Sequence, residues 1–193
     1  MKFVKADWDA EMHGFDLDPS VYLAELQKMR DELPAEAWAF ASDAEHYSMR
    51  SSRCVKDLEL AAISVPTDKR GVLTIEFSAN QWKHDSGLVI RYSGVSHFSI
   101  DCDQSIDWMQ ADTVLLDEIL PRQDGCLHEI ALTDASITVH CRDLEALWGD
   151  AGRAGRAGRA VRRSSGGHPV SGGPSGSGGG VCRRGVLCWG HDR

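Results

Sequence analysis

The chain has 193 residues and a formal net charge of −8, and this charge is divided unequally along it. Residues 1–148 contain 13 Lys and Arg against 27 Asp and Glu, a net charge of −14, whereas residues 149–193 contain 8 against 2, a net charge of +6. Phosphates and anionic lipids repel so acidic a segment, which excludes nucleic acid and a membrane surface as the primary partner of residues 1–148 and favours a basic protein.

Residues 1–148 are long enough to bury a hydrophobic core without disulfides or metals, so we expect them to form one domain that needs no cofactor. No stretch approaches the roughly 20 apolar residues of a membrane span, and the first residues lack the basic and then apolar layout of a signal peptide. A cytoplasmic location is therefore expected. The 6 cysteines should then be free thiols.

Residues 1–50 are expected to be the helical part of this domain. A short strand or arm at residues 1–13, ending in one helical turn, precedes a helix that starts at Asp18 and Pro19, an N-cap followed by a residue suited to the first turn. The apolar residues of this helix recur at helical spacing and are Tyr22, Leu26, Met29 and Leu33. Pro34 ends the helix and begins an alanine-rich second one, which predicts an antiparallel helical hairpin.

Residues 51–148 alternate between apolar and polar side chains, which is typical of strands with one buried face. Strands are expected at residues 55–62, 72–78, 87–92, 95–100 and 113–120, followed by a hairpin at residues 126–141. Strands that follow a group of helices, instead of alternating with them, indicate an α+β fold with an antiparallel β-sheet, here of five to seven strands.

The hairpin at residues 126–141 allows a prediction of register. A turn centred on Asp134 and Ala135 sets the paired residues, which are Leu132 with Ile137, Ile130 with Val139, and His128 with Cys141. One face of the hairpin is then apolar and consists of Cys126, His128, Ile130, Leu132, Ile137, Val139 and Cys141. The other face is mostly polar and places Glu129 opposite His140.

Residues 149–193 differ from the rest in composition. The repeated Ala-Gly-Arg sequence and the Ser, Gly and Pro residues after it contain few large apolar side chains, so we expect this low-complexity tail to be disordered. So abrupt a change directly after Trp148 is typical of a GC-rich gene translated out of frame. A basic nucleic-acid arm and an ordinary linker-like extension are the alternatives.

Short motifs within residues 1–148 carry a resemblance to a known family. They are Met1-Lys2-Phe3 with Trp8, the helix that runs into Leu33-Pro34, Tyr47, the pair Lys56-Asp57 and the hairpin at residues 126–141. In these the chain resembles a family of small uncharacterised bacterial proteins, a domain of unknown function of the immunity-protein type. The resemblance implies that the protein neutralises a toxin, and it supplies no catalytic residues.

Three residues on the apolar face of the hairpin form a candidate metal set. Cys126, His128 and Cys141 offer thiolates and an imidazole, which are ligands typical of zinc. A structural zinc site needs four ligands, however, and the chain has no Cys-x-x-Cys pair. Packing in the core is the preferred interpretation of these residues.

Residues 101–124 are rich in carboxylates and contain one aromatic residue among them. The candidate binding residues of this segment are Asp101, Asp103, Asp107, Trp108, Asp112, Asp117 and Glu118. An aromatic anchor inside a charged rim is a usual interface layout, so we expect these residues to contact a basic protein. The spacing also resembles a calcium loop, but Ile106 occupies the place that needs Gly, and a solvated acidic loop is the simpler alternative.

Together these features favour an acidic, non-enzymatic protein-binding module, and the resemblance implies a basic toxin as its partner. The alternative is a small metal-dependent or hydrolytic enzyme that uses His128 and neighbouring residues. His97, His84 and the Glu129–His140 pair are further acid or base candidates. No G-x-S-x-G, H-E-x-x-H or phosphate-binding glycine loop is present, so no reaction is assigned.

Overall fold

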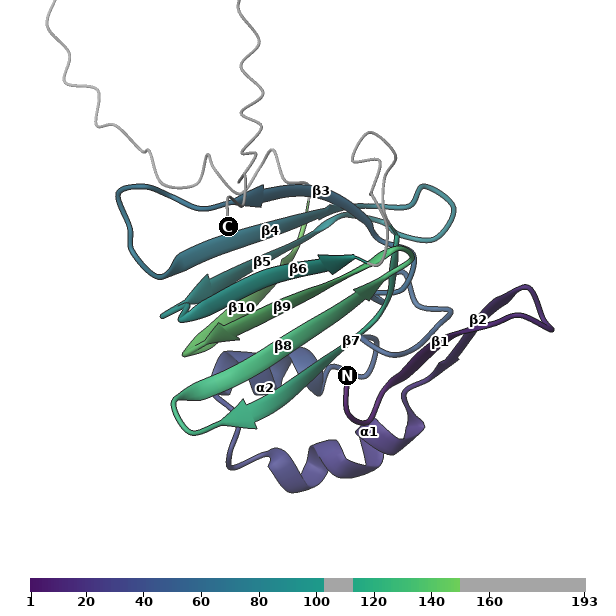
Figure 1. Ribbon diagram of the computed structural model, residues 1–193, viewed down its shortest axis with the longest axis horizontal. Helices are drawn as coiled ribbons and strands as arrows, with labels where there is room; N and C mark the ends of the chain where they lie inside the picture. Colours follow the sequence, from purple (N-terminus) through teal and green to yellow (C-terminus); the bar gives the residue numbers. More distant parts are fainter. Residues whose placement is uncertain (103–112, 150–193) are drawn as a thin grey trace, which may run out of the picture. The chain divides into compact units, whose positions relative to one another are not determined.

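The computed structural model describes residues 1–102 and 113–149, which combine short helices with antiparallel strands and so confirm the α+β class (Figure 1). These residues belong to one structural unit, Met1–Arg159. The helices are α1 (Ser20–Leu26), the 3-10 turn η1 (Gln27–Met29) and α2 (Ala35–Ala41). The strands are β1 (Lys5–Asp9), β2 (Gly14–Asp18), β3 (Glu59–Ser64), β4 (Val72–Ser78), β5 (Leu88–Ser93), β6 (His97–Cys102), β7 (Val114–Arg122), β8 (Gly125–Leu132), β9 (Ala135–Cys141) and β10 (Asp143–Trp148).

The strands of the described residues form three antiparallel sheets. β1 and β2 make a two-stranded sheet of their own, and the four-stranded sheets have the orders β10-β5-β4-β3 and β6-β9-β8-β7. The chain passes from one four-stranded sheet to the other between β5 and β6, and back between β9 and β10. Apolar side chains from both of these sheets belong to one buried cluster, so the two sheets share a core.

The prediction of one sheet with five to seven strands is therefore wrong in detail. The described residues contain ten strands, because β2 and β10 add to those expected and β1 lies within the short strand or arm expected at residues 1–13. Two apolar residues at alternate positions are too short a pattern to identify β2, and acidic residues, which are depleted in strands, surround them. β10 has a burial pattern without clear alternation.

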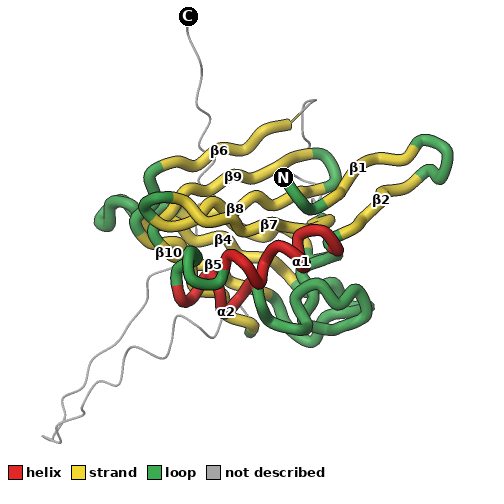
Figure 2. The backbone as a smooth tube through the Cα atoms, turned by 90° about the horizontal axis from the view of Figure 1, so that it is seen from below, coloured by secondary structure: helices red, strands yellow, loops and turns green. Residues whose placement is uncertain are grey.

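The predicted helical hairpin is also absent among the described residues. α1 and α2 have seven residues each, and α2 packs mainly against β10 (Figure 2). α1 instead reaches β7, where the Tyr22 hydroxyl donates a hydrogen bond of 2.8 Å to the Ile119 carbonyl. A sheet offers a short helix a larger apolar surface than another short helix does.

The helical turn expected before Asp18 is a β-turn region that joins β1 to β2. The Asp9 carboxylate accepts hydrogen bonds from the backbone N–H groups of Glu11 and Met12, at 2.8 and 3.0 Å, and this turns the chain back on itself. α1 then begins at Ser20, one residue later than expected, with the Asp18 carboxylate accepting from the Ser20 N–H at 2.8 Å.

The β8–β9 hairpin forms at the predicted place with a register displaced by two residues. The observed pairs include Ile130 with Ile137, His128 with Val139 and Cys126 with Cys141. Because side chains alternate with a period of two, a shift of two changes every partner but leaves each residue on its predicted face. The predicted apolar face is accordingly buried. The predicted Glu129–His140 opposition is wrong, since Glu129 lies opposite Thr138 and His140 opposite Leu127.

Candidate functional site

β7 contains the two most unusual residues of the described core, the consecutive carboxylates Asp117 and Glu118. Consecutive strand residues point to opposite faces, so both can be buried only if both faces of β7 are covered. The exposed fraction is 2% for Asp117 and 0% for Glu118. The prediction that these two residues belong to an exposed contact surface is therefore wrong, and the reason is this two-sided burial.

Asp117 lies at the centre of a buried polar network. Its Oδ1 atom is 2.7 Å from Nε2 of His46, and its Oδ2 atom is 2.8 Å from Nε2 of His128. The other ring nitrogens are also engaged: Nδ1 of His46 is 2.9 Å from the Phe40 carbonyl, and Nδ1 of His128 is 2.9 Å from the Tyr92 hydroxyl. The network thus joins the segment after α2 to β7, β8 and β5.

Hydrogen-bonding roles assign the charges within this network. The Phe40 carbonyl can only accept, and so can the ionised Asp117 carboxylate, so His46 donates from both nitrogens and is an imidazolium. A neutral His128 can donate from Nε2 to Asp117 and accept from the Tyr92 hydroxyl at Nδ1. The buried cluster then holds one negative and one positive charge, which is how a protein interior tolerates charges.

The pKa of Asp117 reflects two opposing effects. Burial by itself raises the pKa of a carboxyl group, because an apolar environment disfavours the charged form. The charge of His46 and the hydrogen bonds from His128 and His46 outweigh burial and hold the pKa of Asp117 well below its ordinary value. Burial raises the pKa of Tyr92 well above its ordinary value, so its hydroxyl keeps its proton.

Two further tyrosines, on and after α1, form hydrogen bonds to the backbone of β7 next to this network. The Tyr47 hydroxyl donates to the Asp117 carbonyl at 3.1 Å, and the Tyr22 hydroxyl accepts from the Ile119 N–H at 3.2 Å. The exposed fractions of His46, Asp117, His128 and Tyr92 are 1%, 2%, 0% and 1%. With every ring nitrogen and both carboxylate oxygens already bonded within the fold, the network holds elements together and presents no atom to a substrate.

Glu118 performs a different structural task on the other face of β7. Its carboxylate accepts three backbone hydrogen bonds, from the N–H groups of Lys2, Phe3 and Val4 at 2.7, 2.6 and 2.6 Å. Hydrogen bonds to a charged acceptor are stronger than those between neutral groups. Glu118 therefore attaches the segment that leads into β1 to β7, the edge strand of its sheet.

The candidate metal set is brought together only in part. The Sγ atoms of Cys126 and Cys141 are 3.5 Å apart on the buried face, and both cysteines are free thiols. His128 lies on the same face but faces Val139, and both of its nitrogens are engaged by Asp117 and Tyr92. The described residues contain no group of three His, Cys, Asp or Glu side chains that could hold a metal ion. The hydrogen bond with Cys141 and burial raise the pKa of the Cys126 thiol, which suits a core residue.

Most of the predicted acidic contact segment lies outside the described residues. Asp101 is exposed at the end of β6, whereas Asp103, Asp107, Trp108 and Asp112 fall in residues 103–112 and are not described. The candidate calcium loop, which began at Asp101, falls in the same segment. The contribution of these residues to binding stays a prediction.

An open pocket of about 650 Å³ lies where the β7–β8 turn meets the end of β9. Its lining includes Ser96, Arg122, His140 and Arg142. Burial and the charges of Arg122 and His97 lower the pKa of His140, and the rings of His97 and His140 are 4.7 Å apart. Asp124 also lines the pocket, so the surroundings of His140 contain both signs of charge. The carboxylate expected directly opposite it, Glu129, lies opposite Thr138.

Sequence reasoning identified His128, Asp117 and Glu118 but missed His46 and Tyr92. His46 is 71 residues from Asp117, and Tyr92 is 36 residues from His128. Neither lies in a motif with its partner. The one available signal was a carboxylate pair inside a strand of otherwise apolar residues, which favours buried and paired carboxylates over exposed ones.

A scan against protein-family models and a search of curated proteins found no match for this chain. No helix in the part of the chain that the structure describes is long and apolar enough to cross a membrane.

Proposed function

We propose that residues 1–148 form a non-enzymatic module that binds a basic protein, in the manner of an immunity protein that neutralises a basic toxin. The single observation that carries this proposal is the division of the carboxylates. Those that could take part in acid or base chemistry, Asp117 and Glu118, are buried and fully bonded, while exposed ones such as Asp7, Glu11 and Asp85 have no ion pair among the described residues.

The surface charge supports a partner of opposite sign. Residues 1–148 carry a net charge of −14. Complementary charge accelerates association and rejects partners of like charge, so an excess of unpaired carboxylates favours a protein rich in Lys and Arg. The resemblance to immunity-type proteins points to the same class of partner.

The alternative, an enzyme that uses His128, has no observation in its favour. The ring is fully buried and both nitrogens are bonded within the core. A general base must reach the proton that it abstracts, directly or through one water, and His128 has no free nitrogen for either.

The test is binding to the proteins encoded by the two genes adjacent to its own. The purified full chain is immobilised, and association with each product is followed by interferometry at about 50 and 300 mM NaCl. We expect one basic product to bind, with an association rate that falls at least about tenfold at the higher salt, because screening shortens the reach of surface charges. Absence of binding to either product, or binding indifferent to salt, contradicts the proposal.

A further inference from the structure

The β1–β2 hairpin stands apart from the rest of the described fold. Its two strands pair with each other and with no further strand in that part of the chain. Figures 1 and 2 show it extending beyond the edge of β7, with the turn at its far end. A two-stranded sheet without other support is marginally stable in water, so its retention in this position calls for a reason beyond folding.

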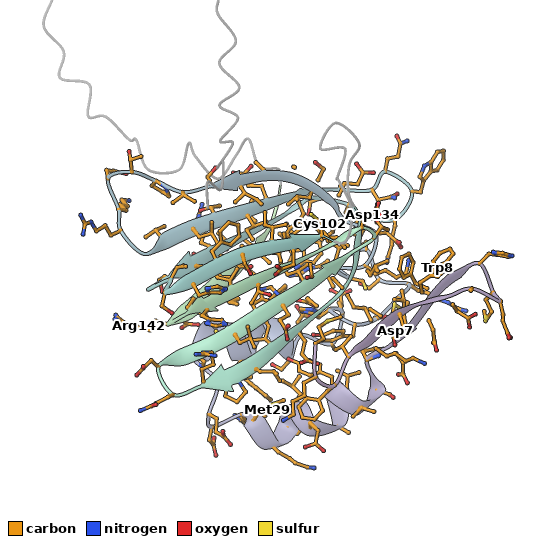
Figure 3. All side chains as sticks on the ribbon, in the orientation of Figure 1. Asp7, Trp8, Met29, Cys102, Asp134 and Arg142 are labelled. Carbon is orange, nitrogen blue, oxygen red and sulfur yellow. The ribbon has the colours of Figure 1, made fainter. Side chains whose placement is uncertain are left out.

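The register divides the hairpin into two unlike faces. Trp8 pairs with Phe15 and Ala6 with Leu17, so these four side chains share one face. Asp7 pairs with Asp16 and Lys5 with Asp18, so the opposite face is acidic. Figure 3 shows Trp8 and Asp7 on the hairpin. The apolar strip is thus backed by a face of carboxylates that also contains one cation, Lys5.

The outer half of the apolar face is open to solvent. Trp8 is 58% exposed, and Met12 in the turn is 79% exposed. The Trp8 and Phe15 rings pack edge to face with ring centroids 5.2 Å apart, which orients the indole while more than half of it stays exposed. Leu17, nearer the body, packs against the core and anchors the base of the hairpin. A large aromatic residue held in one orientation and left exposed is the usual form of an interface anchor.

The acidic face lowers the stability of the hairpin, and the fold itself gives no reason for this loss. Asp7 lies directly opposite Asp16, and like charges at paired positions destabilise a hairpin. Lys5 forms an ion pair with Asp16 at 2.6 Å and attracts Asp7 from a longer distance, but Asp7 and Glu11 have no hydrogen bond or ion pair through their side chains within the described residues. A cation supplied by a bound protein would relieve the part of this repulsion that remains after screening by water and salt.

The turn at the tip is held in a definite conformation. Asp9 accepts two backbone hydrogen bonds, as described above, and His13 has a φ of 49°, in the left-handed region. Met12 is therefore presented on an ordered turn between the two strands. A preordered contact element loses less conformational entropy on binding than a flexible one.

From these observations we infer that the β1–β2 hairpin is the element through which the module contacts its partner. The partner is a basic protein with an apolar pocket for Trp8 and Met12, and with Lys or Arg side chains beside the pocket that face Asp7 and Glu11. This inference rests on the proposed function and assigns it a surface. A second copy of this chain is the wrong occupant, because its residues 1–148 would bring a further −14 charge against the same carboxylates.

The probe for the test is a displayed library of 15-residue peptides. In one half, Lys or Arg flank two apolar positions, and in the other half Asp or Glu flank the same positions. We expect the full chain to enrich the basic half, and the dissociation constants of enriched peptides are then measured for the wild type and for single variants. Trp8→Ala is expected to weaken binding at least about tenfold, as the loss of an anchor does.

Matched variants test whether a loss of binding is specific to the hairpin or follows from the removal of any exposed tryptophan or carboxylate. Trp82 is 88% exposed and lies outside the hairpin, so Trp82→Ala should leave the dissociation constant within about twofold of the wild type. Asp7→Asn removes the repulsion from Asp16, so the hairpin should be as stable as in the wild type or more stable. The dissociation constant is nevertheless expected to rise at least about threefold, because a carboxylate that faces the partner's cations is lost. Asp85→Asn, at another exposed carboxylate, is its control. A purely structural role for Asp7 predicts no such loss.

The outcomes distinguish the two proposals. If the wild type enriches basic peptides and Trp8→Ala and Asp7→Asn bind them unchanged, the hairpin inference is overturned and the proposed function stands. If the wild type enriches no basic peptide, both are overturned. Sedimentation provides the last check: a wild-type dimer that Trp8→Ala converts to monomer would make a second copy the occupant and overturn the inference.

Discussion

The aspartates at the centre of β7 and in the β1–β2 hairpin differ in burial and in bonding. Asp117 is 2% exposed and bonded through both oxygens to histidines from two other parts of the fold. Asp7 is exposed, lies opposite another aspartate and has no hydrogen bond or ion pair through its side chain in the described residues. The same residue type is therefore a bonded part of the core at one position and an exposed surface charge at the other, and only the surface charges are available for the proposed binding.

The first and largest effect is expected when the buried carboxylate is removed. Asp117→Asn leaves the His46 imidazolium in the core without its counter-charge, and breaking a buried pair in this way costs about 3–5 kcal/mol. The free energy of unfolding from urea titration measures this loss. Asp85→Asn, at an exposed position, is the matched control and should change stability by less than about 0.5 kcal/mol. Equal stability of the two variants would contradict the structural role of the network.

The same residue predicts how stability responds to acid. The pKa of Asp117 is lower in the folded protein than in the unfolded chain, so its ionised form contributes stability above the ordinary pKa of about 3.9 and loses it as the pH falls below that value. Asp117→Asn lacks this contribution. Its urea midpoint should therefore fall less steeply than that of the wild type between about pH 4 and pH 2. Parallel curves would show that Asp117 does not have the depressed pKa assigned to it.

A smaller loss is expected on the other face of β7. Glu118→Gln replaces one of the two accepting oxygens with an NH₂ group that faces backbone donors, which leaves buried N–H groups unsatisfied and costs about 1–3 kcal/mol. Hydrogen exchange at Phe3 and Val4 should accelerate at the same time. Glu145→Gln removes an exposed ion pair with Arg91 and should cost less than about 1 kcal/mol. A Glu118→Gln variant as stable as this control would contradict the role of Glu118 in attaching residues 2–4 to β7.

The hairpin is where the smallest effects on stability are expected. Trp8→Ala removes a side chain that is 58% exposed and should change the global free energy of unfolding by about 0.5 kcal/mol or less. Asp7→Asn should slow amide exchange within residues 5–18 by roughly twofold to fivefold, because it removes a cross-strand repulsion worth about 0.2–1 kcal/mol. Faster exchange in this variant would show that Asp7 stabilises the hairpin instead of costing it stability.

Agreement between the predicted and observed folds is best where one property repeats along the chain. The strand expected at residues 72–78 matches β4 (Val72–Ser78), and the buried face of the β8–β9 hairpin is the predicted one, because alternation with a period of two depends only on neighbouring residues. The turn of that hairpin lacks Gly at its centre, so the sequence marks its position only weakly. The predicted turn was one residue away from the observed one, and each residue therefore pairs with a partner two positions from the predicted partner.

The acidic surface charge, the α+β class and the faces of the main strands follow from local composition and periodicity, because these act over a few residues at a time. The burial of Asp117 and Glu118, the loss of the helical hairpin and the exposure of Trp8 depend on which distant segments cover β7 and which leave β1 and β2 uncovered. No local pattern links His46 to Asp117 across 71 residues. Only packing brings such groups within hydrogen-bonding distance, and packing therefore decided which carboxylates are buried in the core and which remain at the surface.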